Sequence, residues 1–114
     1  MTTSLQAFFD AIQPLASGRV FPLVAPEAVI APFIVYQPVS GERVLGLGGD
    51  HRLERLRVQV DTYAKTLNEA LSLQRSVRES ALASVRLADA QLMLTEFDTD
   101  AKLYRAAFDY TYHF

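Results

Sequence analysis

The spacing of apolar residues changes once in the middle of the chain. Apolar and polar side chains alternate from Leu53 to Tyr63, and apolar residues then recur every three or four positions from about Thr66 to Leu82. A repeat of two is typical of a strand with one buried face, and a repeat of three to four is typical of an amphipathic helix. The sequence therefore predicts a strand that runs directly into a helix. The expected strand has two faces: Leu56, Val58, Val60 and Thr62 on the apolar side, and Arg55, Arg57, Gln59 and Asp61 on the polar side.

The first part of the chain predicts a helix and then an extended segment. Helical spacing runs from Leu5 to Ala16, and Gly18 is a natural stop. Because Pro14 removes a hydrogen bond from the last turn, we expect this helix to loosen near Ile12. The segment 19–26 contains prolines and is expected at a sheet edge or in a covering loop.

The remaining pattern predicts three more extended elements and one loop. A strand is expected from Phe33 to Tyr36, extending towards Val39, with Pro38 at an edge or bulge. Residues 40–50 hold four glycines and predict an outward loop, either a hairpin tip or a docking arm. Strands are expected at 90–97 and 103–114, joined by a tight turn at 98–101.

Two features of these elements concern burial. The apolar stripe of the second helix is interrupted by Gln74 and Arg78, so we expect one of its borders to be half exposed. The last strand places aromatic residues and Ala106 on one face from Tyr104 to Phe114, alternating with mostly polar residues on the other face. Since small Ala106 shares this face, packing against a core is favoured over stacking on a ligand.

The order of elements predicts an α+β fold: a mainly antiparallel sheet of about four to five strands with two helices packed on one face. Residues 1–114 are expected to form a single domain. The chain carries a net charge of −2, which argues against a dedicated nucleic-acid binder, and it has no cysteine for disulfides or thiolate metal sites. We expect a soluble cytosolic protein without signal peptide or membrane helix, because no run approaches ~20 apolar residues.

Candidate catalytic and metal sites are weak. The segment Gly46–Gly49 continues into a strand rather than into the Lys-Ser/Thr and helix of a phosphate loop. His51 and Glu54 lie on opposite faces of a strand, and the distant His113 supplies no third metal ligand. The acidic group Glu96, Asp98 and Asp100 is expected to stay hydrated at a turn. The sequence therefore indicates no catalytic residue, no metal site and no cofactor.

A cluster of arginines leaves two interpretations open. Arg55 and Arg57 share the polar face of the central strand, with Arg43 and Arg52 nearby in sequence. These side chains either pair with neighbouring carboxylates on a sheet surface or form a subunit interface or the lining of a DNA passage. Three acids lie among the four arginines, so attraction to phosphate would be weak and salt-sensitive.

Nearly the whole chain resembles the tail-completion proteins, or tail terminators, of long-tailed bacteriophages, prophages and phage-like particles. No single motif is diagnostic; the resemblance lies in an ordered series of proline-flanked and alternating segments. These segments are Arg19–Pro26, Ala31–Tyr36, Leu56–Ala64, a helix ending near Val77–Arg78, and Tyr104–Phe114.

The resemblance implies a non-enzymatic virion protein with an α+β fold. Such proteins assemble as a ring, typically of six copies, on the head-proximal end of the tail tube. The ring stops tube growth and meets a head connector or stopper protein, and double-stranded DNA passes through without sequence-specific binding. The resemblance also implies that the protein is located in the virion tail, and in the host cytoplasm during assembly, and that it has no membrane partner.

The candidate contacts for the ring or tube come from the outward loop and the arginine face. They are Arg43, Gly46, Leu47, Gly48, Arg52, Arg55 and Arg57. Three alternatives remain: another head–tail connector or tail-tube component, a small ligand-binding domain or enzyme, and a nucleic-acid module. The enzyme alternative predicts a buried pocket around Asp61 or Asp109.

Overall fold

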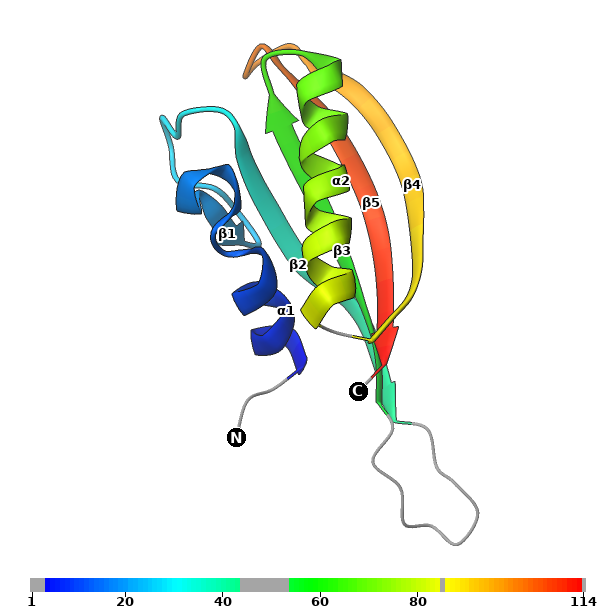
Figure 1. Ribbon diagram of the computed structural model, residues 1–114. Coiled ribbons are helices and arrows are strands. Elements are labelled where there is room, and N and C mark those ends of the chain that lie inside the picture. The colour runs from blue at the N-terminus through cyan, green and yellow to red at the C-terminus, as the bar shows by residue number, and fades with distance from the viewer. Residues whose placement is uncertain (1–3, 44–53, 85, 114) are drawn as a thin grey trace, which may run out of the picture.

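The computed structural model describes residues 4–43, 54–84 and 86–113 and contains one five-stranded sheet with two α-helices (Figure 1). The strand order in the sheet is β1-β2-β3-β5-β4. The elements in chain order are α1 (Ser4–Ile12), a 3-10 turn (Leu15–Gly18), β1 (Val20–Pro22), β2 (Phe33–Arg43), β3 (Glu54–Ala64), α2 (Leu67–Ser84), β4 (Arg86–Asp98) and β5 (Leu103–His113).

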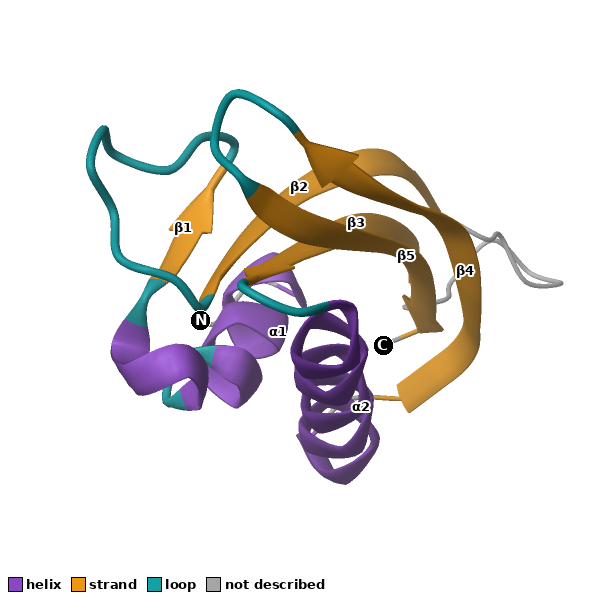
Figure 2. Ribbon diagram, turned by 90° about the horizontal axis from the view of Figure 1, so that it is seen from above, coloured by secondary structure: helices purple, strands orange, loops and turns teal. Residues whose placement is uncertain are grey.

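The sheet is mostly antiparallel. The pairs β2–β3, β3–β5 and β5–β4 are antiparallel, whereas β1 pairs in parallel with β2. The two helices lie on the same face of the curved sheet (Figure 2). These features confirm the predicted α+β class. The parallel pairing of β1 was not foreseen; of the two positions expected for 19–26, a sheet edge or a covering loop, the edge is observed for Val20–Pro22.

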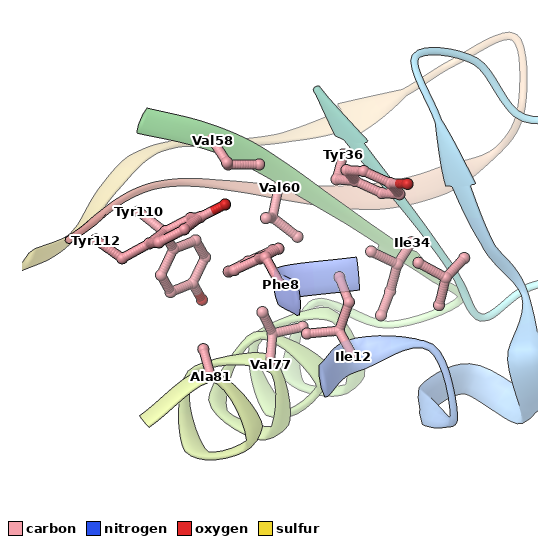
Figure 3. Packing of buried hydrophobic residues seen from close by; sticks show 11 residues of the cluster. Phe8, Ile12, Ile34, Tyr36, Val58, Val60, Val77, Ala81, Tyr110 and Tyr112 are labelled. Carbon is pink, nitrogen blue, oxygen red and sulfur yellow. The ribbon is translucent and has the colours of Figure 1, made fainter. Parts of the chain in front are cut away.

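The core lies between the helices and the sheet face that carries alternate residues of β3. Val58, Val60 and Thr62 are fully buried, which confirms the predicted inward face of this strand. Phe8 of α1 stacks on Tyr112 of β5 with ring centroids 5.3 Å apart. Side chains from both helices and from β1, β2, β3 and β5 meet in this core (Figure 3). The aromatic face of the last strand is therefore part of the core, as predicted.

The prolines act as the sequence predicts. The helix α1 ends at Ile12, two residues before Pro14. The register between β2 and β3 shifts between Pro38 and Ser40, so a bulge forms where a residue without an N–H interrupts the ladder. The strand nevertheless continues to Arg43, further than predicted, and the glycine-rich part of the expected loop lies outside the described residues.

Between β3 and α2 there are only two residues, Lys65 and Thr66. The hydroxyl of Thr66 accepts a hydrogen bond of 3.1 Å from the backbone N–H of Glu69, which caps the helix. Thus the predicted direct passage from strand to helix is confirmed. It orients α2 back along the sheet, where it contacts β3, β5 and β4.

The prediction of a half-exposed border on α2 holds for Arg78, which is exposed, and is wrong for Gln74. Gln74 is 2% exposed, and its side-chain N–H groups donate to the carbonyl oxygens of Val60 and Ala106, at 2.7 and 2.9 Å. Its Oε1 accepts a hydrogen bond of 2.7 Å from Tyr110. The glutamine is tolerated in the core because its amide is hydrogen-bonded to two strands.

Candidate functional site

The sheet face opposite the helices, here called the polar face, carries the arginines of β3. Arg57 forms an ion pair with Asp109 on the neighbouring strand β5. The hydrogen bond and the charge of Asp109 raise the pKa of Arg57 above its ordinary value. Of the two interpretations of the arginine cluster, pairing with a carboxylate is therefore observed for Arg57. Arg55 is exposed further along the same strand.

A second arginine ties three strands together on the polar face. Arg105 of β5 lies 3.0 Å from Asp61 of β3 and 2.7 Å from Glu96 of β4. Burial by itself would lower the pKa of Arg105, but the hydrogen bond from Arg105 to Glu96 and the charge of Asp61 raise it above the ordinary value. Asp61 also accepts a hydrogen bond of 2.9 Å from Gln59. This group fixes the positions of the strands and keeps a permanent positive charge beside Asp61.

A groove of about 530 Å³ lies next to this ion-pair network and is called here the Asp61 groove. Its floor is the polar face, with Gln59, Asp61 and Arg105, and its walls come from the segment 23–29 and the β4–β5 hairpin. The enzyme alternative predicted a buried pocket around Asp61 or Asp109, whereas this groove adjoins Asp61 but is partly open to solvent. The charged groups on its floor, however, face each other in ion pairs at hydrogen-bonding distance. Such an arrangement binds strands together and offers no nucleophile–base pair.

Two groups of exposed apolar side chains lie at opposite edges of the sheet. On β4, Leu92, Met93, Leu94 and Phe97 are 39–55% exposed, and we call them the β4 patch. In the connection from β1 to β2, Leu23, Val24 and Ile30 are 66–75% exposed, and we call them the β1-loop patch. Figure 2 shows β1 and β4 on opposite sides of the molecule. These patches are candidates for contact with another protein surface.

The predicted contact residues are only partly placed. Arg43 ends β2, and Arg55 and Arg57 lie on β3, so the structure brings the three to one end of adjacent strands. Gly46, Leu47, Gly48 and Arg52 lie outside the described residues, as does His51.

The acidic turn has an internal structural role. The carboxylate of Asp98 accepts hydrogen bonds from the backbone N–H groups of Asp100 and Ala101, at 3.0 and 3.1 Å. This side chain closes the predicted tight turn. Within the described residues no group of three or more His, Cys, Asp or Glu side chains could hold a metal ion. No helix there has the length and apolar character needed to cross a membrane.

Sequence reasoning missed the β4 patch and the Arg105 network. The run Leu92-Met-Leu94 breaks the alternation of its strand, and three consecutive apolar residues cannot all face one core. This was a usable signal for an exposed apolar edge. The network had no comparable signal, because Asp61 and Arg105 are 44 positions apart and meet only through strand pairing.

Comparison with known proteins identifies a family and similar solved structures. The family described as "Tail completion protein gp17" has a sequence profile that matches residues 6–113. A chain from "Virion of native gene transfer agent (GTA) particle" has a similar structure, with a TM-score of 0.54 and 12% sequence identity over 93% of this chain and 82% of that one. No curated protein matches this chain. At this identity the structural likeness shows a shared fold.

Proposed function

Since this chain belongs to the family of tail completion protein gp17, we propose that it completes the tail of a phage-like particle by forming a ring at the head-proximal end of the tail tube. The ring ends tube growth and offers a surface to the head connector or stopper protein. Double-stranded DNA passes through the ring without sequence-specific binding. The protein acts as a structural component of the virion tail.

The family match carries this proposal, because it extends over residues 6–113 of a 114-residue chain. The similar chain from a gene transfer agent virion supports it at the level of the fold. The net charge of −2 fits a conduit through which DNA slides, because a strongly basic lumen would hold the phosphates. A non-enzymatic role agrees with the ion pairs of the Asp61 groove, whose carboxylate is held by Arg105 and Gln59.

We further propose that the end of the sheet around Arg43, Arg55 and Arg57, together with Gly46, Leu47, Gly48 and Arg52, contacts the tube or a neighbouring subunit. Arg55 is the best probe among them. It is exposed, and its substitution does not remove either partner of the Arg57–Asp109 ion pair.

A deletion of the gene in an inducible host tests tail completion. Electron microscopy of the induced lysate is expected to show filled heads beside separate or over-long tails, and a plasmid copy of the gene restores joined particles. Loss of all tails would instead indicate a tail-tube component. Normal joined particles in the deletion strain would overturn the proposal and leave only the fold in common with the family.

A further inference from the structure

The strand β4 is an exposed sheet edge with apolar side chains on both of its faces. Leu92 lies opposite Phe108 and Phe97 opposite Tyr104, on the helix side of the sheet. Leu94 lies opposite Ala107 on the polar face, and Met93 lies between two register positions, where the ladder shifts. A natural edge strand usually carries charges or prolines that prevent association. The run Leu92–Leu94 in the middle of β4 lacks both, although Asp89 and Glu96 lie on either side of it, so this stretch of the edge is suited to a protein partner.

The other edge of the sheet has a different kind of apolar surface. The β1-loop patch lies in a segment with prolines at 22, 26 and 32. Leu23 and Ala28 have positive φ angles of 67° and 60°, so the backbone here is not extended. This segment cannot add a regular strand to a sheet, because prolines have no N–H and the backbone turns. It can pack its exposed Leu23, Val24 and Ile30 against other side chains.

The charges distinguish two ways in which copies of the chain could meet. Residues 86–102 contain four acids, Asp89, Glu96, Asp98 and Asp100, against two bases, Arg86 and Lys102, and Glu96 is paired with Arg105, so this edge keeps a small excess of acidic residues. A two-fold contact between two β4 edges would bring both acidic sets together, which is unfavourable. The segment 20–32 contains a single charged residue, Glu27, and the preceding residue is Arg19. The β1-loop edge is therefore the better electrostatic match for the β4 edge.

We propose that the β4 patch of one copy packs against the β1-loop patch of a second copy. The inference rests on the proposed function, since a ring needs a contact between two different surfaces. Pairing one edge with the opposite edge is such a head-to-tail contact, and it repeats around an axis until the ring closes. In each contact Leu92, Met93, Leu94 and Phe97 lose exposure to water together with Leu23, Val24 and Ile30.

Cysteine cross-linking tests this contact, because the natural sequence has no cysteine. Val24→Cys and Leu92→Cys are placed on separate gene copies and expressed together in the deletion host. Purified particles are then treated with a short bismaleimide. The proposal expects a covalent dimer from the mixture and none from either variant alone. The double variant Val24→Cys/Leu92→Cys gives a ladder of bands that ends at the copy number of the ring.

The control is Arg75→Cys, an exposed position on α2 that belongs to neither patch. Paired with Val24→Cys it is expected to give no dimer. Cross-linking of Leu92→Cys alone would replace the proposed contact with a two-fold contact between β4 edges. A lack of cross-links in the double variant within joined particles would overturn the proposal.

Failure of the contact and failure of the function are separate outcomes. Joined particles that contain the cysteine variants without cross-links refute the contact and leave tail completion intact. Joined particles in the deletion strain itself refute tail completion. If the double variant gives no particles, the pair Ile30→Cys and Met93→Cys repeats the test at the same two patches.

Discussion

At the scale of single residues, Tyr110 and Gln74 connect the second helix to the sheet. The Tyr110 hydroxyl is buried and donates to Oε1 of Gln74 at 2.7 Å. Burial raises the pKa of Tyr110 well above its ordinary value of 10, because the phenolate would lose its water. A tyrosine whose folded-state pKa is raised contributes its full stability below about pH 10. That contribution decreases above pH 10, where the unfolded chain loses the proton first.

The variant Tyr110→Phe is therefore expected to change the free energy of unfolding differently in two pH ranges. Near pH 8 it lowers the free energy of unfolding by about 1–3 kcal/mol, because Oε1 of Gln74 loses its donor. Above pH 10 the free energy of unfolding falls less steeply for the variant than for the natural protein. Urea denaturation from pH 8 to 11 measures both effects, with Tyr104→Phe as a less buried control. If the free energy of unfolding fell equally steeply with pH for Tyr110→Phe and for the natural protein, the raised pKa of Tyr110 would be contradicted.

At the scale of secondary structure elements, Arg105 holds β3, β5 and β4 in their order on the polar face. Its two carboxylate partners come from the strands on either side of β5. Removing an arginine from a buried pair leaves a carboxylate that has lost its counter-charge. The ion pair of Arg105 with Glu96 therefore adds a side-chain link to the backbone pairing of β4 with β5, next to the β4 patch.

We expect Arg105→Met to lower the free energy of unfolding by roughly 3 kcal/mol. This is the lower end of the range for breaking a buried ion pair, because the side chain of Arg105 is partly exposed. The double variant Arg105→Met/Asp61→Leu is expected to be more stable than Arg105→Met, since the unpaired carboxylate is removed as well. Urea denaturation of both variants measures the difference. The control Arg75→Met, on the exposed side of α2, changes stability by about 0.5 kcal/mol or less. If Arg105→Met/Asp61→Leu were no more stable than Arg105→Met, the ion pair between Arg105 and Asp61 would not contribute to stability.

At the scale of the whole molecule, the arginine end of the sheet and the two apolar edges are separate surfaces, so each can be tested alone. Charge reversal at Arg57 would place two carboxylates together at Asp109 and disturb the fold. Arg55→Glu changes the exposed charge and leaves that ion pair intact. We expect Arg55→Glu to reduce the number of joined particles about tenfold or more. Like charges brought together in a contact cost several kcal/mol, and about 1.4 kcal/mol already lowers a binding constant tenfold.

The measurement is a particle count by electron microscopy of the deletion host complemented with Arg55→Glu. Arg75→Glu is the matched control, with the same change of charge on α2, and should complement fully. Circular dichroism of both purified variants checks that the fold is retained. A normal count of joined particles for Arg55→Glu would remove this face from the proposed contacts.

Most helices, strands and buried faces could be predicted from local sequence patterns, because backbone sterics and side-chain spacing act within a few residues. The inward face of β3, the end of α1 before Pro14, the bulge at Pro38 and the turn closed by Asp98 all followed from such patterns. Contacts between residues distant in sequence could not be predicted in this way. The burial of Gln74, the pairing of Asp61 with Arg105 and the parallel pairing of β1 depend on strand order and on how α2 crosses the sheet. Strand order also placed the two apolar patches at opposite edges, since no local pattern specifies which strand remains at the edge of a sheet.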